Sequence, residues 1–128
     1  MPKILLVEKN FSDRGKAIAL LKPKSFEFIF SDSFDEATKV LMGKNLIDGV
    51  ITTREIYLSE EFKIIKPFGE TIAKICKDIK IPCVICTTMD TGLEKKINGQ
   101  PIVIHKDWGK AIEILEIEMS KISQSQPA

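Results

Sequence analysis

Several features that would narrow the function of this 128-residue sequence are missing from it. No apolar run approaches the ~20 residues that span a bilayer, and the first apolar stretch, Ile4 to Val7, is too short for a signal-peptide core. Neither sign of charge dominates, because 19 basic side chains face 18 acidic ones. Nucleic-acid binders usually carry a basic excess, so this balance argues against that class. We expect a cytoplasmic protein that binds neither nucleic acid nor membrane.

Metal and redox chemistry also have little support. One histidine and three cysteines form no recognisable zinc pattern. Cys83 and Cys86 match C-x-x-C, but they lie inside an apolar segment, where residues three apart point to opposite faces of a strand. A redox thiol needs a site such as a helix N-terminus that lowers its pKa. No glycine-rich phosphate loop follows the first apolar segment. We expect buried cysteines, no metal, no cofactor, no catalytic residue and hence no enzyme.

Five short apolar segments alternate with helical patterns. The segments are residues 3–7, 26–30, 47–53, 81–87 and 101–104. They lack polar alternation, which is typical of strands buried on both faces of a parallel sheet. Ser33 and Glu36 predict a capping box for one helix, and Asp107 predicts the cap of the last helix. A brief helix is expected over 90–97, closed by Asn98-Gly99.

The order of these segments predicts one α/β domain over residues 1–122, with helices on both faces of the sheet. Residues 123–128 are polar, and we interpret them as a flexible tail or a truncated linker. In such sheets, ligands bind beyond the carboxyl ends of the strands. The residues that follow the strands are therefore the candidates for a site.

Those strand ends carry Glu8 and Lys9 after the first segment, Thr53 after the third, Thr87 after the fourth and Lys106 after the fifth. In this order the sequence resembles the response-regulator receiver domains of bacterial two-component signalling. The resemblance covers essentially the whole chain. It implies a flavodoxin-like three-layer sandwich whose five parallel strands have the order 2-1-3-4-5.

The resemblance also exposes departures from the family. Receiver domains hold Mg²⁺ with two acidic residues after the first strand, and an aspartate at the end of the third strand accepts the phosphoryl group. Here Lys9 takes the second acidic position and Thr53 the phosphoacceptor position, whereas Thr87 and Lys106 match the family's hydroxyl and lysine. At ~4 Å, a lysine would oppose a cation by roughly 1 to 4 kcal/mol. The resemblance therefore implies a degenerate pocket.

Two interpretations of this pocket stay open. Glu8 can pair with Lys9 or Lys106, and this ion pair would replace the metal and lock one conformation. Alternatively, Lys9 points into water and locks nothing. In both cases the leading function is a signalling domain that binds protein partners without phosphorylation. The alternatives are a phosphorylatable receiver with an unorthodox carboxylate (Asp32, Glu55 or Asp90) and a small-molecule sensor that uses the strand-end pocket.

Two further regions are candidate interaction surfaces. The segment from residue 54 to 68 carries Tyr57, Phe62 and Phe68 and is too apolar for an ordinary solvated loop. We expect it to fold over the pocket as a cap, and the alternative is a lid or partner-docking loop. On the last helix, Ile114 flanks the core stripe and Ile117 lies opposite it. The resemblance implies a homodimer through the last strand and helices, and we expect a protein partner of unspecified identity.

Overall fold

The structure, a computed structural model, describes residues 2–43, 46–88, 96–97, 99–103 and 107–125. Helices and strands alternate along most of the chain. In order, they are β1 (Lys3–Val7), α1 (Phe11–Leu21), the 3-10 turn η1 (Lys22–Lys24), β2 (Glu27–Ser31), α2 (Phe34–Met42), β3 (Gly49–Thr53), β4 (Ile56–Tyr57), β5 (Ile65–Lys66), α3 (Phe68–Asp78), β6 (Cys83–Cys86), β7 (Lys96–Ile97), β8 (Gln100–Val103) and α4 (Trp108–Ser125). The five predicted parallel strands correspond to β1, β2, β3, β6 and β8.

The central sheet has the strand order β2-β1-β3-β6-β8-β7. Its first five strands are parallel and have the predicted order 2-1-3-4-5. β7 adds a sixth strand, which pairs antiparallel with β8 at the edge.

β7 corrects the prediction of a brief helix over 90–97. Lys96 and Ile97 are extended and pair with Pro101 and Gln100, so the prediction is wrong for these two residues, and 90–95 lie outside the described residues. The reason lies in Asn98-Gly99, a dipeptide that favours a two-residue hairpin turn as well as a helix end. Gly99 has φ of 78°, a conformation in which glycine meets no steric penalty.

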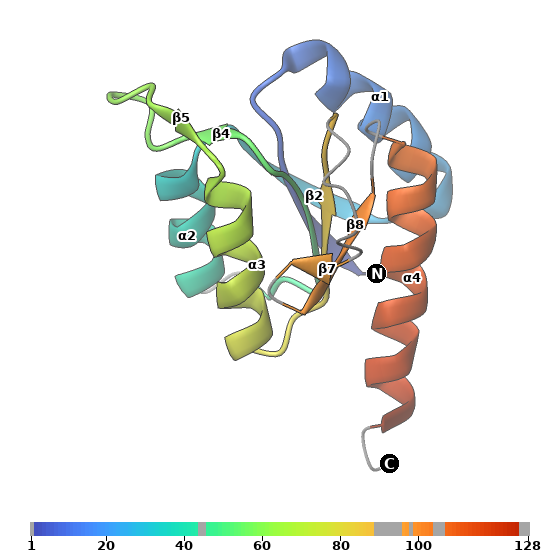
Figure 1. Cartoon of the computed structure of the whole chain (residues 1–128). Coiled ribbons are helices and arrows are strands. Elements are labelled where there is room, and N and C mark those ends of the chain that lie inside the picture. The colour runs from blue at the N-terminus through green and yellow to red at the C-terminus, as the bar shows by residue number, and fades with distance from the viewer. Residues whose placement is uncertain (1, 44–45, 89–95, 98, 104–106, 126–128) are drawn as a thin grey trace.

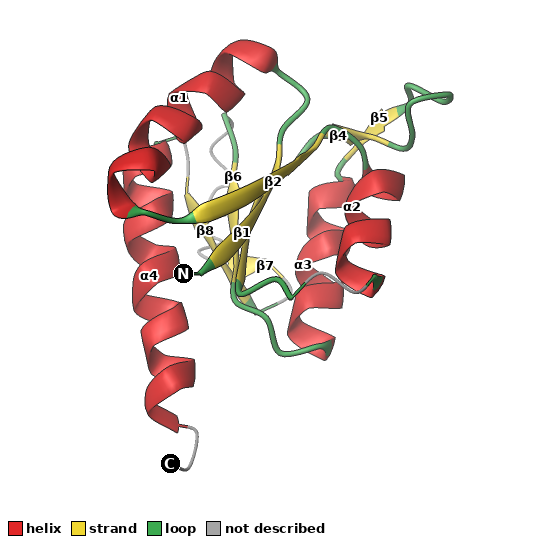
Figure 2. Cartoon of the chain, turned by 180° about the vertical axis from the view of Figure 1, so that it is seen from behind, coloured by secondary structure: helices red, strands yellow, loops and turns green. Residues whose placement is uncertain are grey.

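Helices cover both faces of the sheet. α1 and α4 lie on one face, and α2 and α3 lie on the other (Figures 1 and 2). Successive strand residues enter opposite cores: Ile4, Leu6, Ile51 and Val84 face α1 and α4, whereas Leu5, Val7, Val50 and Ile85 face α2 and α3. Cys83 and Cys86 also lie buried in opposite cores and form no disulfide, so the expectation of buried cysteines is confirmed.

Side-chain and backbone caps define the helix ends. The Ser33 hydroxyl accepts a hydrogen bond from the Glu36 amide at 3.2 Å, and Asp107 Oδ1 accepts one from the Lys110 amide at 3.1 Å. α4 continues to Ser125, past residue 122 where the sequence predicts the end of the domain, and residues 126–128 lie outside the described part of the chain. Among the described helices, none is both long enough and apolar enough to cross a membrane.

Candidate functional site at the carboxyl end of the sheet

The turn from β1 into α1 positions the first site residue, Glu8. This carboxylate is fully buried, and its Oε1 accepts a hydrogen bond from the Asn10 amide at 2.9 Å. The Glu8 amide in turn donates to the Ser31 carbonyl at 3.0 Å, which ties the end of β1 to the end of β2. Hydrogen bonds to the backbone therefore fix both the side chain and the amide of Glu8.

Lys9 lies in the wall of a small pocket of about 170 Å³ at the strand ends. The pocket residues are Lys9, Thr53, Arg54, Glu55, Cys86, Thr87 and Thr88. Among the described residues, the ion pairs include none between Lys9 and Glu8. Lys106 lies outside the described residues, so the predicted Glu8–Lys106 pair stays a prediction. Of the two predicted lysines, Lys9 is the one that the structure places in the pocket wall.

The two threonines of the site are buried at the ends of their strands. Thr53 ends β3, is 2% exposed, and donates its hydroxyl hydrogen to the Val7 carbonyl at 3.3 Å. Thr87 follows β6, and its amide donates to the Val103 carbonyl at 2.9 Å. Thr53 is thus turned toward the neighbouring strand, where its proton is bonded to a carbonyl oxygen.

α3 closes the site from the other side through a glycine contact. A Cβ at Gly69 would overlap the Thr53 carbonyl oxygen and lie 2.8 Å from the Arg54 Cα, so only glycine lets α3 start here. The Gly69 amide donates to the Arg54 carbonyl at 3.0 Å. Arg54 Nε lies 2.7 Å from Glu70 Oε2, and its Nη1 lies 3.8 Å from Glu55 Oε1. The guanidinium is therefore held at the pocket by two carboxylates.

The donor set does not suit Mg²⁺. Such a site usually offers one or two carboxylates together with other oxygen ligands in octahedral geometry. Here Glu8 is a buried carboxylate at the end of β1 and Glu55 lines the pocket, but Glu55 is paired with Arg54, and the ammonium group of Lys9 belongs to the same pocket. Within the described ranges, no three His, Cys, Asp or Glu side chains gather in a way that could hold a metal ion. The side chains at this site therefore do not fit a metal ion.

The segment after the pocket does not form the expected cap. β4 and β5 pair as a hairpin that projects past the ends of α2 and α3 (Figure 1), and none of its residues lines the strand-end pocket. The hairpin joins the start of α2 instead, where the Asp35 amide donates to the Leu58 carbonyl at 2.9 Å and Ser33 bridges to Tyr57. Of the segment 54–68 that was predicted as a cap, only Arg54 and Glu55 line the pocket; the prediction is wrong for the hairpin, because these backbone bonds attach it to the start of α2.

The hairpin exposes several large apolar side chains. Phe62 is 60% exposed, and Ile64 and Ile65 are each 49% exposed. Between the hairpin and α2 lies a groove of about 500 Å³, lined by Phe34, Asp35, Lys39, Leu58, Ser59, Glu60, Glu61 and Phe62. Phe68 does not belong to this surface, since it begins α3 and stacks on Phe34 with ring centroids 5.3 Å apart.

Acidic side chains gather beside the same groove. The pKa of Glu36 is raised, first by partial burial and then by a hydrogen bond with Asp32 and the negative charges of Asp32 and Glu60. Arg14 opposes this shift. The end of β2, the start of α2 and the hairpin therefore share a negative potential.

The two isoleucines predicted for an interface on α4 differ in their surroundings. Ile114 is half-buried and packs against the core formed with α1. Ile117 is 51% exposed. Of the predicted pair, only Ile117 therefore presents most of its side chain to the surface.

Comparisons with known proteins give a clear result for the fold. No family model and no curated protein matches the sequence. Solved structures do match, with probability 1.00. The receiver domain of a Francisella response regulator is 15% identical with a TM-score of 0.75, and the match covers 95% of this chain and 99% of that one.

Two further structures agree. The N-terminal domain of a response regulator/sensory box/GGDEF protein from Carboxydothermus hydrogenoformans is 16% identical over 95% of this chain and 97% of that one, with a TM-score of 0.73. A response regulator receiver domain protein from Clostridium thermocellum is 17% identical over 98% and 100%, with a TM-score of 0.74. The chain has the fold of a response-regulator receiver domain.

The receiver fold confirms the flavodoxin-like sandwich that the sequence predicts. It brings Glu8, Lys9, Thr53 and Thr87 to one edge of the sheet. Sequence reasoning missed the Arg54–Glu70 pair and the tight approach of Gly69. The two members of that ion pair are 16 residues apart, and nothing in the local pattern links them.

Proposed function

We propose that this chain is a regulatory protein-interaction domain that uses the receiver fold without phosphorylation and has no enzymatic activity. The observation that carries the proposal is the state of Thr53 at the end of β3. Its side chain is buried, and its hydroxyl donates to the Val7 carbonyl. Aspartyl phosphorylation needs a carboxylate nucleophile and a divalent cation, and Thr53 supplies neither the nucleophile nor a metal ligand of that charge.

The electrostatics of the pocket support the same proposal. Lys9 adds a positive charge to the pocket wall, where a receiver domain would bind a cation, whereas the charge of Arg54 is balanced by Glu55 and Glu70. At ~4 Å a lysine opposes a metal cation by roughly 1 to 4 kcal/mol. The pocket is therefore poorly suited to hold a metal.

Two rival functions receive less support. Glu55 lines the pocket and could serve as an unorthodox phosphoacceptor, but its carboxylate lies 3.8 Å from Arg54 Nη1. Asp32 is hydrogen-bonded to Glu36, and Asp90 lies outside the described residues.

A small-molecule sensor at this site would have about 170 Å³ available, below the roughly 300 to 1,000 Å³ of typical ligand pockets.

We propose the hairpin, with the groove beside it, as the surface that binds the partner. Exposed apolar patches that are rimmed by polar residues often mark interaction sites. Phe62 lines the groove, and Ile64 and Ile65 are exposed on the same hairpin. Glu60 and Glu61 supply negative charge, whereas Asp35 is paired with Lys39. Charge complementarity then calls for a segment of a partner protein that carries basic and apolar side chains. The predicted homodimer through the last strand and helices has less support, because Ile114 packs into the core.

Phosphorylation independence is tested by intact-mass spectrometry. The protein is incubated with acetyl phosphate and Mg²⁺, and a sample without Mg²⁺ is the control. We expect an unchanged mass in both samples. A Mg²⁺-dependent gain of one phosphoryl group would overturn this part of the proposal, and variants at Glu55 and Asp32 would then locate the acceptor.

The hairpin surface is tested separately with a dye-labelled peptide in which lysine and leucine alternate. Fluorescence anisotropy should show binding that weakens as salt is added, and the triple change Phe62→Ser, Ile64→Ser, Ile65→Ser should reduce affinity at least about fivefold. Leu46→Ser is the matched control, since Leu46 is 85% exposed but lies before β3, at the other end of the sheet. If the triple variant and the wild type bind the peptide equally well, the hairpin is not the surface that binds it.

A further inference from the structure

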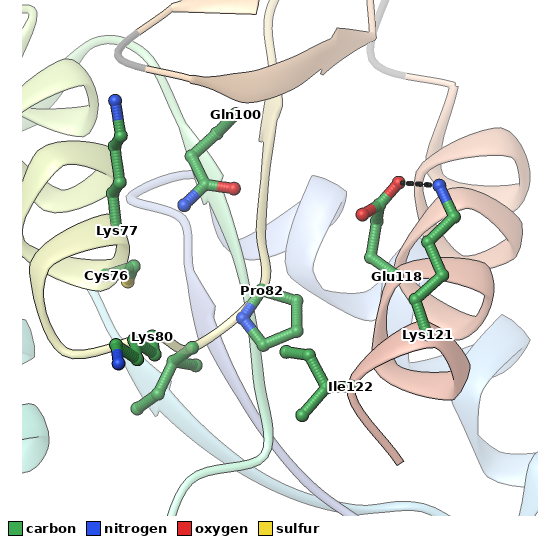
Figure 3. A pocket seen from close by; sticks show the side chains of 9 residues that line it. Cys76, Lys77, Lys80, Pro82, Gln100, Glu118, Lys121 and Ile122 are labelled. Atoms are coloured by element: carbon green, nitrogen blue, oxygen red, sulfur yellow. Dashed lines mark hydrogen bonds and ion pairs between the residues drawn. The ribbon is translucent and has the colours of Figure 1, made fainter. Parts of the chain in front are cut away.

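A second, larger groove lies at the opposite end of the sheet, where the parallel strands begin. Its volume is about 600 Å³, and it opens between the end of α3, the start of β8 and the last turns of α4 (Figure 3). The residues that line it are Cys76, Lys77, Lys80, Ile81, Pro82, Gln100, Glu118, Lys121 and Ile122. None of them belongs to the strand-end pocket or to the hairpin groove.

The rim of this groove is positively charged. Three lysines face one carboxylate, and that carboxylate, on Glu118, pairs with Lys121 at 3.2 Å. In the described part of the chain, Lys77 and Lys80 take part in no ion pair. Two cations at the groove therefore have no protein counter-charge there.

The floor of the groove combines apolar surface with one buried amide. Ile81 and Pro82 supply apolar surface to its lining, with Pro82 between the end of α3 and Ile122 of α4 (Figure 3). The Gln100 side chain is 9% exposed, and its two hydrogen bonds are long: Oε1 accepts from the Cys83 amide at 3.4 Å, and Nε2 donates to the Ala73 carbonyl at 3.5 Å. Bonds of this length lie at the outer limit of hydrogen-bond geometry, so this buried amide retains capacity for a closer polar partner.

The backbone at Lys80 is an independent sign that the groove is specialised. α3 ends in a Schellman motif, with the Ile81 amide bonded to the Cys76 carbonyl at 2.9 Å and the Lys80 amide bonded to the Lys77 carbonyl at 3.2 Å. The residue at the left-handed position of this motif is usually glycine, but here it is Lys80, with φ of 62°. Lys80 therefore holds a left-handed backbone that glycine would adopt at lower cost, and this conformation fixes where its side chain leaves α3 at the groove.

We propose that this groove binds a small organic anion with an apolar body. Lys77 and Lys80, whose ammonium groups lie at different ends of the groove's rim (Figure 3), attract its carboxylate, phosphate or sulfonate group, while its apolar part lies on Ile81 and Pro82 and a polar atom meets the Gln100 amide. The volume is in the range of small-molecule sites, which pair an apolar lining with a few polar groups. This binding site goes beyond the proposed partner surface and does not depend on it.

The test uses anilinonaphthalene sulfonate, an aromatic anion whose fluorescence rises on binding, with the folded protein at neutral pH. We expect saturable binding that Lys80→Gly and Lys77→Ala each weaken about fivefold or more. Lys74→Ala is the matched control, because Lys74 lies on the same helix but does not line the groove. Amide signals of Gly99 and Gln100 in an NMR titration should shift as the probe is added.

Lys80→Gly separates binding from folding. Glycine relieves the left-handed backbone strain, so this variant should melt about 3 °C higher while it binds the probe more weakly. The uncharged parent compound, phenylnaphthylamine, should bind clearly less well than the sulfonate. The proposal is overturned if there is no saturable binding, if both lysine variants bind like the wild type, or if the uncharged compound binds equally well.

Discussion

The strand-end pocket and the hairpin groove use neighbouring stretches of the chain, since Arg54 and Glu55 line the pocket and Leu58 to Phe62 line the groove, but they differ in size, exposure and charge. The pocket is small and polar, Thr53 and Thr87 are buried, and the Thr53 hydroxyl is bonded to a backbone carbonyl. The groove is about 500 Å³ and acidic, and it is flanked by three large apolar side chains that remain exposed. A site that performs chemistry needs reactive groups that a substrate can reach, whereas a site that binds a partner needs apolar surface and charge.

This contrast supports the proposal that the hairpin is the surface that binds a partner. At the pocket, the Thr53 hydroxyl is bonded to the Val7 carbonyl and Arg54 is paired with Glu55, so a substrate would have to displace these contacts. At the hairpin, apolar surface remains in contact with water, and burying it against a partner releases roughly 25 cal/mol per Å². Substitutions in the two regions should therefore differ in the size of their effect on stability.

The largest effect should come from Gly69→Ala, which acts on the wall of the pocket. The added Cβ meets the Thr53 carbonyl oxygen and the Arg54 backbone, which cannot move without disturbing β3, so we expect a loss of about 3 kcal/mol or more in the free energy of unfolding. Urea denaturation measures it. Gly15→Ala in α1 is the control, because no atom lies within 4 Å and alanine should stabilise the helix by about 0.5–1 kcal/mol. A Gly69→Ala protein of wild-type stability would show that α3 is not pinned to the pocket.

A smaller but more specific effect should follow Thr53→Asp, which restores the carboxylate of the receiver family. The site is 2% exposed, so a charged group there should cost about 2–3 kcal/mol at neutral pH. Burial raises the pKa of the introduced carboxyl group, while Lys9 and Arg54 in the same pocket lower it; because Arg54 is already paired with Glu55 and Glu70, we expect burial to dominate, so the penalty should shrink as the pH falls and the group binds its proton. Denaturation at neutral pH and near pH 4 separates these states, and Thr53→Val controls for the lost hydroxyl. A stable Thr53→Asp protein at neutral pH would contradict a closed pocket.

The smallest effect concerns the acidic side of the groove. The pKa of Glu36 is raised above its usual 4.5, so its protonated form is favoured in the folded state, and its contribution to stability is lost as the pH rises above that value. Glu36→Gln should therefore stabilise the protein at neutral pH, by less than about 0.5 kcal/mol because the side chain is largely solvated, and should have no such benefit near pH 4. Thermal melts at both pH values measure this, with Glu113→Gln on α4 as the control. An equal gain at both pH values would point to a cause other than charge.

Much of the fold could be predicted from local signals. Apolar segments without polar alternation predicted the five parallel strands, and Ser33, Glu36 and Asp107 marked helix starts that the structure has. These features depend on residues that are close in sequence, so a pattern can reveal them. The β7 strand was missed because Asn98-Gly99 suits a helix end and a hairpin turn equally well.

The strand-end residues Glu8, Lys9, Thr53 and Thr87 were also determined by the sequence, because parallel strands bring their carboxyl ends to one edge. Only the tertiary structure decided the rest. The hairpin turns away from the pocket because its backbone bonds to the start of α2, Arg54 finds Glu70, and the lysine-rimmed groove forms where α3, β8 and α4 meet. Each of these depends on contacts between residues far apart in the chain, and no local periodicity encodes such contacts.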